Sequence, residues 1–126
     1  MERGAVKVAG FGFRAAATAE SLRAALRAAE GGGVGALATL AEKISAPTLL
    51  TLAEELGVPV IPVTAAALAG VETLTQSPRL HARLGTGSLA EAAALCAAGQ
   101  GARLLGPRAT APDGMATAAI AERISS

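Results

Sequence analysis

A glycine-rich turn runs directly into a helix start in the stretch Gly85-Thr86-Gly87-Ser88-Leu89-Ala90-Glu91-Ala92-Ala93-Ala94-Leu95-Cys96-Ala97-Ala98-Gly99. Ser88 is a favoured N-cap residue, and Glu91 three positions later completes an S-x-x-E capping box, so we expect a helix from Ser88 to Gly99. This helix is apolar almost all round, which predicts packing on more than one face. Its first turn presents free N–H groups and positive dipole, which suit a carboxylate or phosphate. We therefore expect a ligand there first.

The composition favours one ordinary globular domain over residues 1–126. The net charge is +1 and the basic residues are scattered, which argues against a nucleic-acid partner. The single Cys96 cannot form an internal disulfide, and the N-terminus has no signal peptide, so we expect a cytoplasmic protein. The longest uncharged run, residues 56–71, is interrupted by two prolines and is a poor membrane span.

Apolar runs alternate with helical repeats along the chain, and this predicts an α/β fold. We expect strands over residues 5–9, 34–40, 58–63, 102–105 and 115–120, with a tight turn after the first strand at residues 10–14. Helices are expected near 22–29, from 47 to 56, near 65–69 and 79–83, and from 88 onward. The order predicts a three-layer α/β/α sandwich, with a mostly parallel sheet and an antiparallel C-terminal strand pair.

Three stretches resemble one known family, and they are Gly10-Phe11-Gly12-Phe13-Arg14, Leu37-Ala38-Thr39-Leu40-Ala41-Glu42-Lys43 and the 85–99 segment. Together with residues 116–121 they resemble the CobE family and the related C-terminal domain of CbiG, proteins of cobalamin (vitamin B12) biosynthesis. Gly87 stands where the family often has proline, and Arg108 where it often has lysine. A role that needs a lysine amine is therefore not carried over at Arg108, whereas a role that needs only positive charge is.

The resemblance implies a role in the corrinoid pathway. CbiG proteins carry a further N-terminal portion, so the chain looks like the stand-alone CobE of the aerobic route. Binding or carrying a precorrin or corrinoid intermediate is the first expectation, with other enzymes of the pathway as further partners. The alternative is a CbiG-like hydrolase that opens the lactone of cobalt-precorrin-5A and releases acetaldehyde. We expect no cofactor and no metal site, because His81 is the only histidine and no metal-ligand spacing is visible.

Precorrins carry many carboxylates around an apolar ring, so we expect glycine-lined turns and separated cations to bind them. Arg14 and Lys43 follow the first two strands, at the strand ends where α/β sheets usually bind ligands, and Thr86 and Ser88 are hydrogen-bond donors. Each candidate also has a purely structural interpretation: Arg14 and Lys43 as surface charges, Ser88 as a helix cap, and the glycines as residues that let a strand and a helix pack closely. The predicted substrate-binding residues are Gly10, Gly12, Arg14, Lys43, Thr86, Gly87, Ser88 and Arg108.

Acid/base catalysis has three candidates, Lys43, Glu91 and His81. Ser88 is a poor nucleophile candidate, because no base partner is visible in the sequence. A further alternative is a small nucleotide-binding α/β domain, since Gly10, Gly12 and Ala15 give G-x-G-x-x-A after a strand. That pattern is weak on its own, because the acidic residue at about the right distance precedes the second strand instead of ending it.

Overall fold

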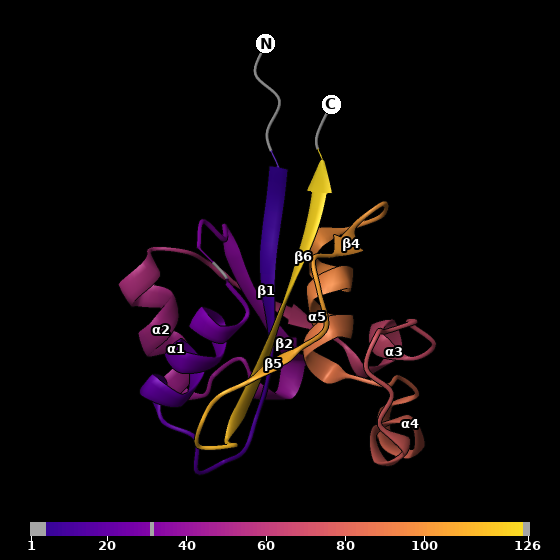
Figure 1. Cartoon of the computed structure of the whole chain (residues 1–126), viewed down its shortest axis with the longest axis horizontal. Helices are drawn as coiled ribbons and strands as arrows, with labels where there is room; N and C mark the ends of the chain where they lie inside the picture. Colours follow the sequence, from indigo (N-terminus) through magenta and orange to yellow (C-terminus); the bar gives the residue numbers. More distant parts are fainter. Residues whose placement is uncertain (1–4, 31, 125–126) are drawn as a thin grey trace.

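A computed structural model describes residues 5–30 and 32–124, and a mixed β-sheet forms its centre (Figure 1). Strands β1 (Ala5–Phe13), β2 (Ala36–Leu40) and β3 (Val60–Val63) are parallel neighbours. Strand β6 (Ala116–Ile124) runs antiparallel to β1 on one side and to the short β4 (Arg103–Leu104) and β5 (Ala109–Thr110) on the other. The strand order is β3-β2-β1-β6-β4, with β5 also paired to β6.

Helices cover both faces of this sheet, which confirms the predicted three-layer sandwich (Figure 1). Helices α1 (Ala19–Ala28) and α2 (Pro47–Leu56) lie on one face, and α5 (Leu89–Ala98) lies on the other. The short α3 (Ala65–Leu68) packs beside α5, and α4 (Pro78–Leu84) lies between α3 and α5 in the chain. A 3₁₀ turn, η1 (Ala41–Lys43), comes directly after β2. No helix among the described residues is both long and apolar enough to cross a membrane.

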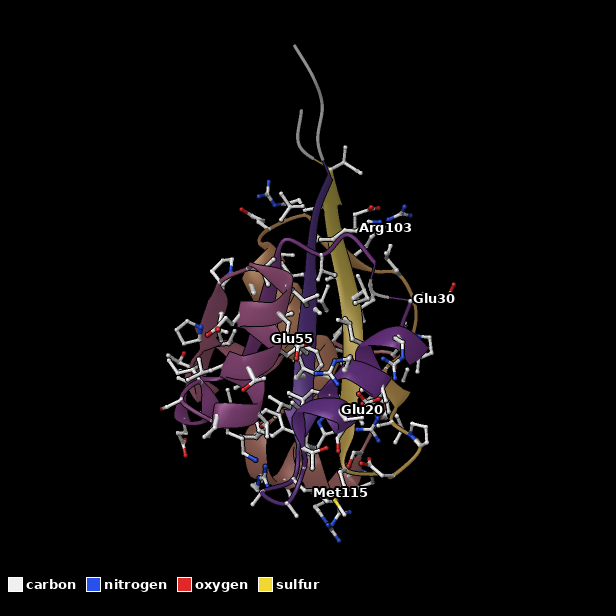
Figure 2. All side chains as sticks on the ribbon, turned by 90° about the vertical axis from the view of Figure 1, so that its left-hand side faces the viewer. Glu20, Glu30, Glu55, Arg103 and Met115 are labelled. Carbon is white, nitrogen blue, oxygen red and sulfur yellow. The ribbon has the colours of Figure 1, made fainter. Side chains whose placement is uncertain are left out.

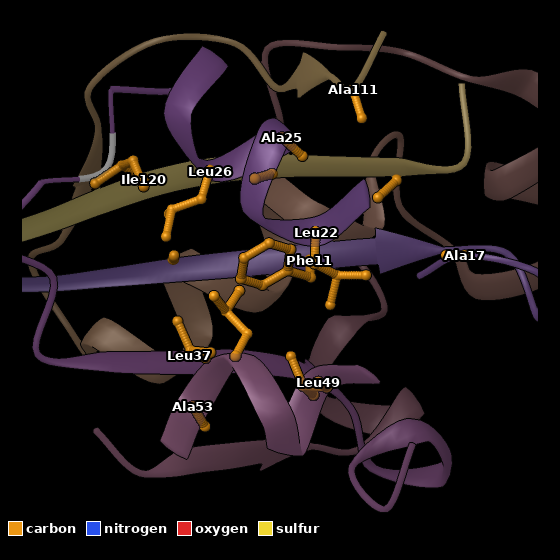
Figure 3. Close-up of a cluster of buried hydrophobic side chains, with 14 residues drawn as sticks. Phe11, Ala17, Leu22, Ala25, Leu26, Leu37, Leu49, Ala53, Ala111 and Ile120 are labelled. Carbon is orange, nitrogen blue, oxygen red and sulfur yellow. The ribbon is translucent and has the colours of Figure 1, made fainter. Parts of the chain in front are cut away.

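Two apolar cores flank the sheet because successive strand residues point to opposite faces. Phe11 of β1 packs with leucines of α1, β2 and α2 in the core drawn in Figure 3. Val8 of β1 faces the other way, into a core built from the alanines of α5. Alanine side chains are thin, so α5 can pack closely against the sheet.

The last strand forms more of the sheet than the sequence predicts. Strand β6 pairs with β1 along its whole length, from Ala116 opposite Phe13 to Ile124 opposite Ala5. The expected antiparallel C-terminal pair is present as β4 with β6. Strand β5 lies between the strands expected at residues 102–105 and 115–120, where no strand was expected.

The prediction of a tight turn at residues 10–14 is wrong, because β1 continues through Phe13. Gly10 and Gly12 therefore lie within a strand, and α1 begins only at Ala19, after its N-cap Thr18. A dinucleotide fingerprint needs its glycines in the turn between strand and helix, so that turn is not formed here. This structural result removes the sequence basis for the nucleotide-binding alternative.

Local signals placed most other elements correctly. Helix α2 begins at Pro47 and ends at Leu56, and its C-cap Gly57 has a φ of 67°, the left-handed conformation that favours glycine. Strand β3 lies at the edge of the sheet, where Pro62 is tolerated. Helix α5 starts after Ser88, whose hydroxyl oxygen accepts a hydrogen bond from the Glu91 backbone N–H.

Candidate functional site

A pocket of about 570 Å³ opens at the carboxyl ends of β1 and β2, where β6 begins. In Figure 2 this end of the molecule is marked by Met115, and it lies opposite the end at which β6 finishes. The pocket is lined by parts of β1, η1, α4, the α5 start, the 108–110 segment and the turn before β6. The lining residues are Gly12, Phe13, Arg14, Leu40, Lys43, Ser77, Arg79, Leu80, Arg83, Leu89, Arg108, Thr110, Gly114, Met115, Ala116 and Thr117.

The charge of this lining is one-sided. Five of its side chains are basic, and none of those that the structure describes is acidic. Apolar side chains, with Phe13, Leu80 and Met115 among them, share the lining with the cations. Separated cations beside apolar surface can hold a ligand that carries several carboxylates on an apolar body.

Lys43 is held in place by the end of β1. Its Nζ donates a hydrogen bond of 2.7 Å to the Phe13 carbonyl and lies 4.9 Å from the centre of the Phe13 ring. A contact of this kind stabilises the ammonium by cation–π attraction. Because a protonated lysine has three donors and one is used here, the others remain for a ligand.

Arg14 and Gly12 meet the start of β6 on the same side of the pocket. The Arg14 backbone N–H donates to the Met115 carbonyl at 2.9 Å, and the exposed Arg14 side chain lines the pocket. The Thr117 hydroxyl donates to the Gly12 carbonyl at 3.3 Å. The structure therefore brings together four of the predicted binding residues, namely Gly12, Arg14, Lys43 and Arg108.

Arg79 and Arg83 were not among the predicted binding residues, although the sequence contained a signal for them. They are four positions apart on α4, so they lie on one face of that helix. Both line the pocket, together with Leu80 of the same helix. Helix α4 begins after Ser77, whose side chain accepts from the Leu80 backbone N–H.

The other predicted binding residues lie outside the pocket lining, because the fold itself uses them. Thr86 and Ser88 are fully buried, and the Thr86 hydroxyl donates to the Val71 carbonyl at 2.7 Å. Gly87 packs so closely on the preceding loop that an added Cβ would come within 2.4 Å of the Thr75 carbonyl oxygen. Gly10 is buried in the same way beneath α5. The 86–88 turn, where a ligand was expected first, therefore lies outside this pocket.

The start of α5 is occupied by the chain's own carboxylate. The side chain of Glu91, in the first turn of α5, accepts hydrogen bonds from the backbone N–H groups of Leu74, Thr75 and Arg108, not from the Ser88 backbone as a capping box requires. A carboxylate at this position is stabilised by the positive end of the helix dipole. The helix start at which we expected a carboxylate or phosphate ligand therefore holds the Glu91 side chain.

The three acid/base candidates are separated in space. Glu91 is buried and fully hydrogen-bonded, while His81 is an exposed residue of α4 whose Nε2 contacts the Gln76 side-chain oxygen. Lys43 alone among them lines the pocket. Among the described residues, no three histidine, cysteine or acidic side chains are grouped so that they could hold a metal ion.

Asp113 fastens the turn below the pocket to α1. Its carboxylate accepts from the Ser21 hydroxyl at 2.5 Å and from the Met115 backbone N–H at 2.8 Å. These two hydrogen bonds, the Ser21 bond above all, hold the pKa of Asp113 below its usual value. On the far side of the sheet from α1, burial raises the pKa of the Cys96 thiol, whose Sγ donates to the Ala67 carbonyl at 3.4 Å.

Comparison with known proteins gives consistent matches over nearly the whole chain. Residues 7–121 match the family model described as "Cobalamin synthesis G C-terminus". CobE, described in its crystal structure as a protein from the cobalamin (vitamin B12) biosynthetic pathway, is 34% identical in sequence to this chain. The two structures match with a TM-score of 0.78 over 94% of this chain and 93% of that one. Cobalamin biosynthesis protein chiG from Agrobacterium tumefaciens is 36% identical, with a TM-score of 0.69 over 92% of this chain and 97% of that one. No curated protein matches the chain.

Proposed function

We propose, since this chain belongs to the cobalamin synthesis G C-terminal family, that its basic pocket binds a precorrin or corrinoid intermediate of cobalamin biosynthesis. The observation that carries this proposal is the pocket lining, in which five cations stand beside apolar side chains without an acidic neighbour among the described lining residues. The two similar solved proteins, both described as cobalamin biosynthesis proteins, support the same pathway.

The chemistry of the ligand class matches the chemistry of the pocket. A precorrin carries acetate and propionate side chains around its ring, and each carboxylate that meets an arginine or lysine gains a charge-assisted hydrogen bond, worth about 0.2–1 kcal/mol where the pair is exposed to solvent. Phe13, Leu80 and Met115 offer apolar contact for the ring. Arginine suits this task because its planar fork can hold a carboxylate by two parallel bonds.

Binding is favoured over lactone hydrolysis by the placement of the acid/base candidates. A hydrolase needs a group that activates water and a group that protonates the leaving oxygen. Of the three candidates, Lys43 lines the pocket, whereas Glu91 and His81 do not. Lys43 itself is engaged with the Phe13 carbonyl and ring, which suits a fixed positive charge.

The proposal is tested by titrating the purified protein with hydrogenobyrinic acid, a metal-free corrin polycarboxylate, and following its visible spectrum. We expect a saturable spectral shift that weakens as salt is raised, because salt screens exposed charges. The neutral methyl ester of the same corrin is the matched control and should bind more weakly. The absence of any shift at high micromolar protein would contradict the proposal.

A further inference from the structure

Glu91 is a buried carboxylate that corrin binding does not use directly. Its side chain is 0% exposed, and each of its two oxygens accepts two hydrogen bonds. Oε1 accepts from the backbone N–H groups of Leu74 at 2.6 Å and Thr75 at 3.0 Å. Oε2 accepts from the Thr75 hydroxyl at 2.5 Å and the Arg108 backbone N–H at 2.9 Å. An ionised carboxylate has only acceptors, and four donors converge on it here.

The donors come from two segments that are distant in the sequence. Leu74 and Thr75 lie in the loop that leads into α4, and α4 carries Arg79 and Arg83. Arg108 lies in the segment between β4 and β5, seventeen positions after Glu91. The cations of both segments line the same pocket.

We infer that Glu91 is a positioning residue, which fixes both segments to the first turn of α5 so that their three arginines face one pocket. The effect on corrin binding rests on the proposed function, whereas the fastening of the two segments does not. Removing a partner of a buried carboxylate costs more than removing a surface ion pair, because the buried group keeps its desolvation penalty. One side chain therefore holds two loops in position by hydrogen bonds.

Glutamine at this position separates the two fastenings. A glutamine has one acceptor oxygen and one NH₂ donor, so only one of the two carboxylate positions can still accept backbone N–H bonds. Its oxygen keeps the two bonds of Leu74 and Thr75 if it takes the Oε1 position, and its NH₂ can then donate to the Thr75 hydroxyl. The Arg108 N–H is left facing a donor. E91Q should thus release the Arg108 segment alone, whereas E91A should release both.

Amide hydrogen exchange, read residue by residue by NMR, tests this on the full chain. In E91Q we expect exchange at the Arg108 amide to rise about tenfold or more, the equivalent of one lost charge-assisted hydrogen bond, while Leu74 and Thr75 stay near their wild-type rates. In E91A all three amides should exchange faster. S88A is the matched control, because it removes the cap of the same helix turn without touching the carboxylate, and it should leave the Arg108 amide protected.

Binding of hydrogenobyrinic acid to the same variants reads out the consequence for the pocket. We expect E91Q to weaken binding by about the same factor as R108Q, which keeps the backbone bond but removes the charge. An unchanged Arg108 exchange rate in E91Q, or an equal rise in S88A, would overturn the inference. If the wild-type protein fails to bind the corrin, the proposed function fails, and the exchange rates still decide whether Glu91 fastens the two segments.

Discussion

At the scale of single residues, Gly10 controls how closely α5 packs on the sheet. An ideal Cβ at Gly10 would lie 2.0 Å from the Ala90 carbonyl oxygen and 2.6 Å from the Ala94 backbone nitrogen. Both atoms belong to the helix backbone, so no side chain can turn away to make room. The glycine is required by this close approach and not by an unusual backbone angle.

Substituting Gly10→Ala should therefore destabilise the fold. Overpacking of this kind costs typically about 1–3 kcal/mol, which exceeds the gain of about 0.4–1 kcal/mol from a less flexible unfolded chain. Gly106→Ala is the control, because nothing lies within 4 Å of its added Cβ and its φ is outside the left-handed region. Urea denaturation measures both variants. Equal free energies of unfolding for Gly10→Ala and Gly106→Ala would contradict the packing argument.

At the scale of elements, the segment from β4 to β6 is hydrogen-bonded to two helices that are far apart in the sequence, α1 and α5. Glu91 of α5 accepts from the Arg108 N–H, and Asp113 accepts from the Ser21 hydroxyl of α1. Each fastening joins this segment to a helix on a different face of the sheet (Figure 1). The pocket end of the sheet is thereby tied to both helical layers.

The Asp113 fastening predicts a pH dependence of stability. Because hydrogen bonds lower the pKa of Asp113 in the folded state, its carboxylate stabilises the fold above about pH 4, and this contribution is lost as the pH falls through the lowered pKa. Asp113→Asn should flatten the fall of the melting temperature between about pH 5 and pH 2. Glu20, whose pKa is lowered by Arg27 and Arg23, keeps part of the dependence in that variant.

Glu54→Gln is the control for the pH experiment, since it changes an exposed side chain of α2. The control should reproduce the wild-type curve of melting temperature against pH. If Asp113→Asn also reproduces the wild-type curve, the Ser21–Asp113 hydrogen bond does not contribute to stability.

The elements that could be predicted from the sequence are those with local signals. Ser88 marks the start of α5 because its hydroxyl bonds the N–H three residues later, and the Pro47 and Gly57 signals bound α2 correctly. Helix α4 also has local signals, in Ser77, Pro78 and Gly85, whereas residues 71–77 and β5 depend on long-range contacts. The bonds that Glu91 makes to residues 16 and 17 positions away leave no periodic pattern in the sequence.

The candidate site was predictable in part for the same reason. Arg14 and Lys43 follow two strands that pair in parallel, so both had to reach the same end of the sheet. Residues 86–88 do not line the pocket, although their composition predicts an anion site. The fold places the Glu91 carboxylate at this helix start instead. The spacing of Arg79 and Arg83 places both on one face of α4, but that this face lines the pocket depends on where α4 packs.

At the scale of the whole molecule, positive charge gathers at one end of a chain whose net charge is only +1. The α1–α2 face shows the contrast, because Arg23 is paired there with Glu20 and Glu55, which are labelled in Figure 2. Cations that already have acidic partners are poor anion binders. The pocket cations line a surface to which no acidic side chain of the described lining residues contributes.

Neutralising the α4 arginines should weaken corrin binding without unfolding the protein. We expect Arg79→Gln and Arg83→Gln each to raise the dissociation constant about threefold to tenfold, a range that reflects the solvent exposure of α4. Arg27→Gln on α1 is the control, since Arg27 pairs with Glu20 away from the pocket lining. Spectral titration with hydrogenobyrinic acid gives the three constants. Equal weakening by Arg27→Gln would mean that net charge, and not the pocket, drives binding.

The location of the ligand is tested most directly by ¹H–¹⁵N NMR of the protein titrated with hydrogenobyrinic acid. We expect the amides of residues 12–14, 108–110 and 114–117 to shift together and to saturate, while those along the outer face of α2 stay in place. A spectrum that does not change, or shifts that cluster on α1 and α2 instead, would contradict the claim that the basic pocket at the carboxyl ends of β1 and β2 is the corrinoid site.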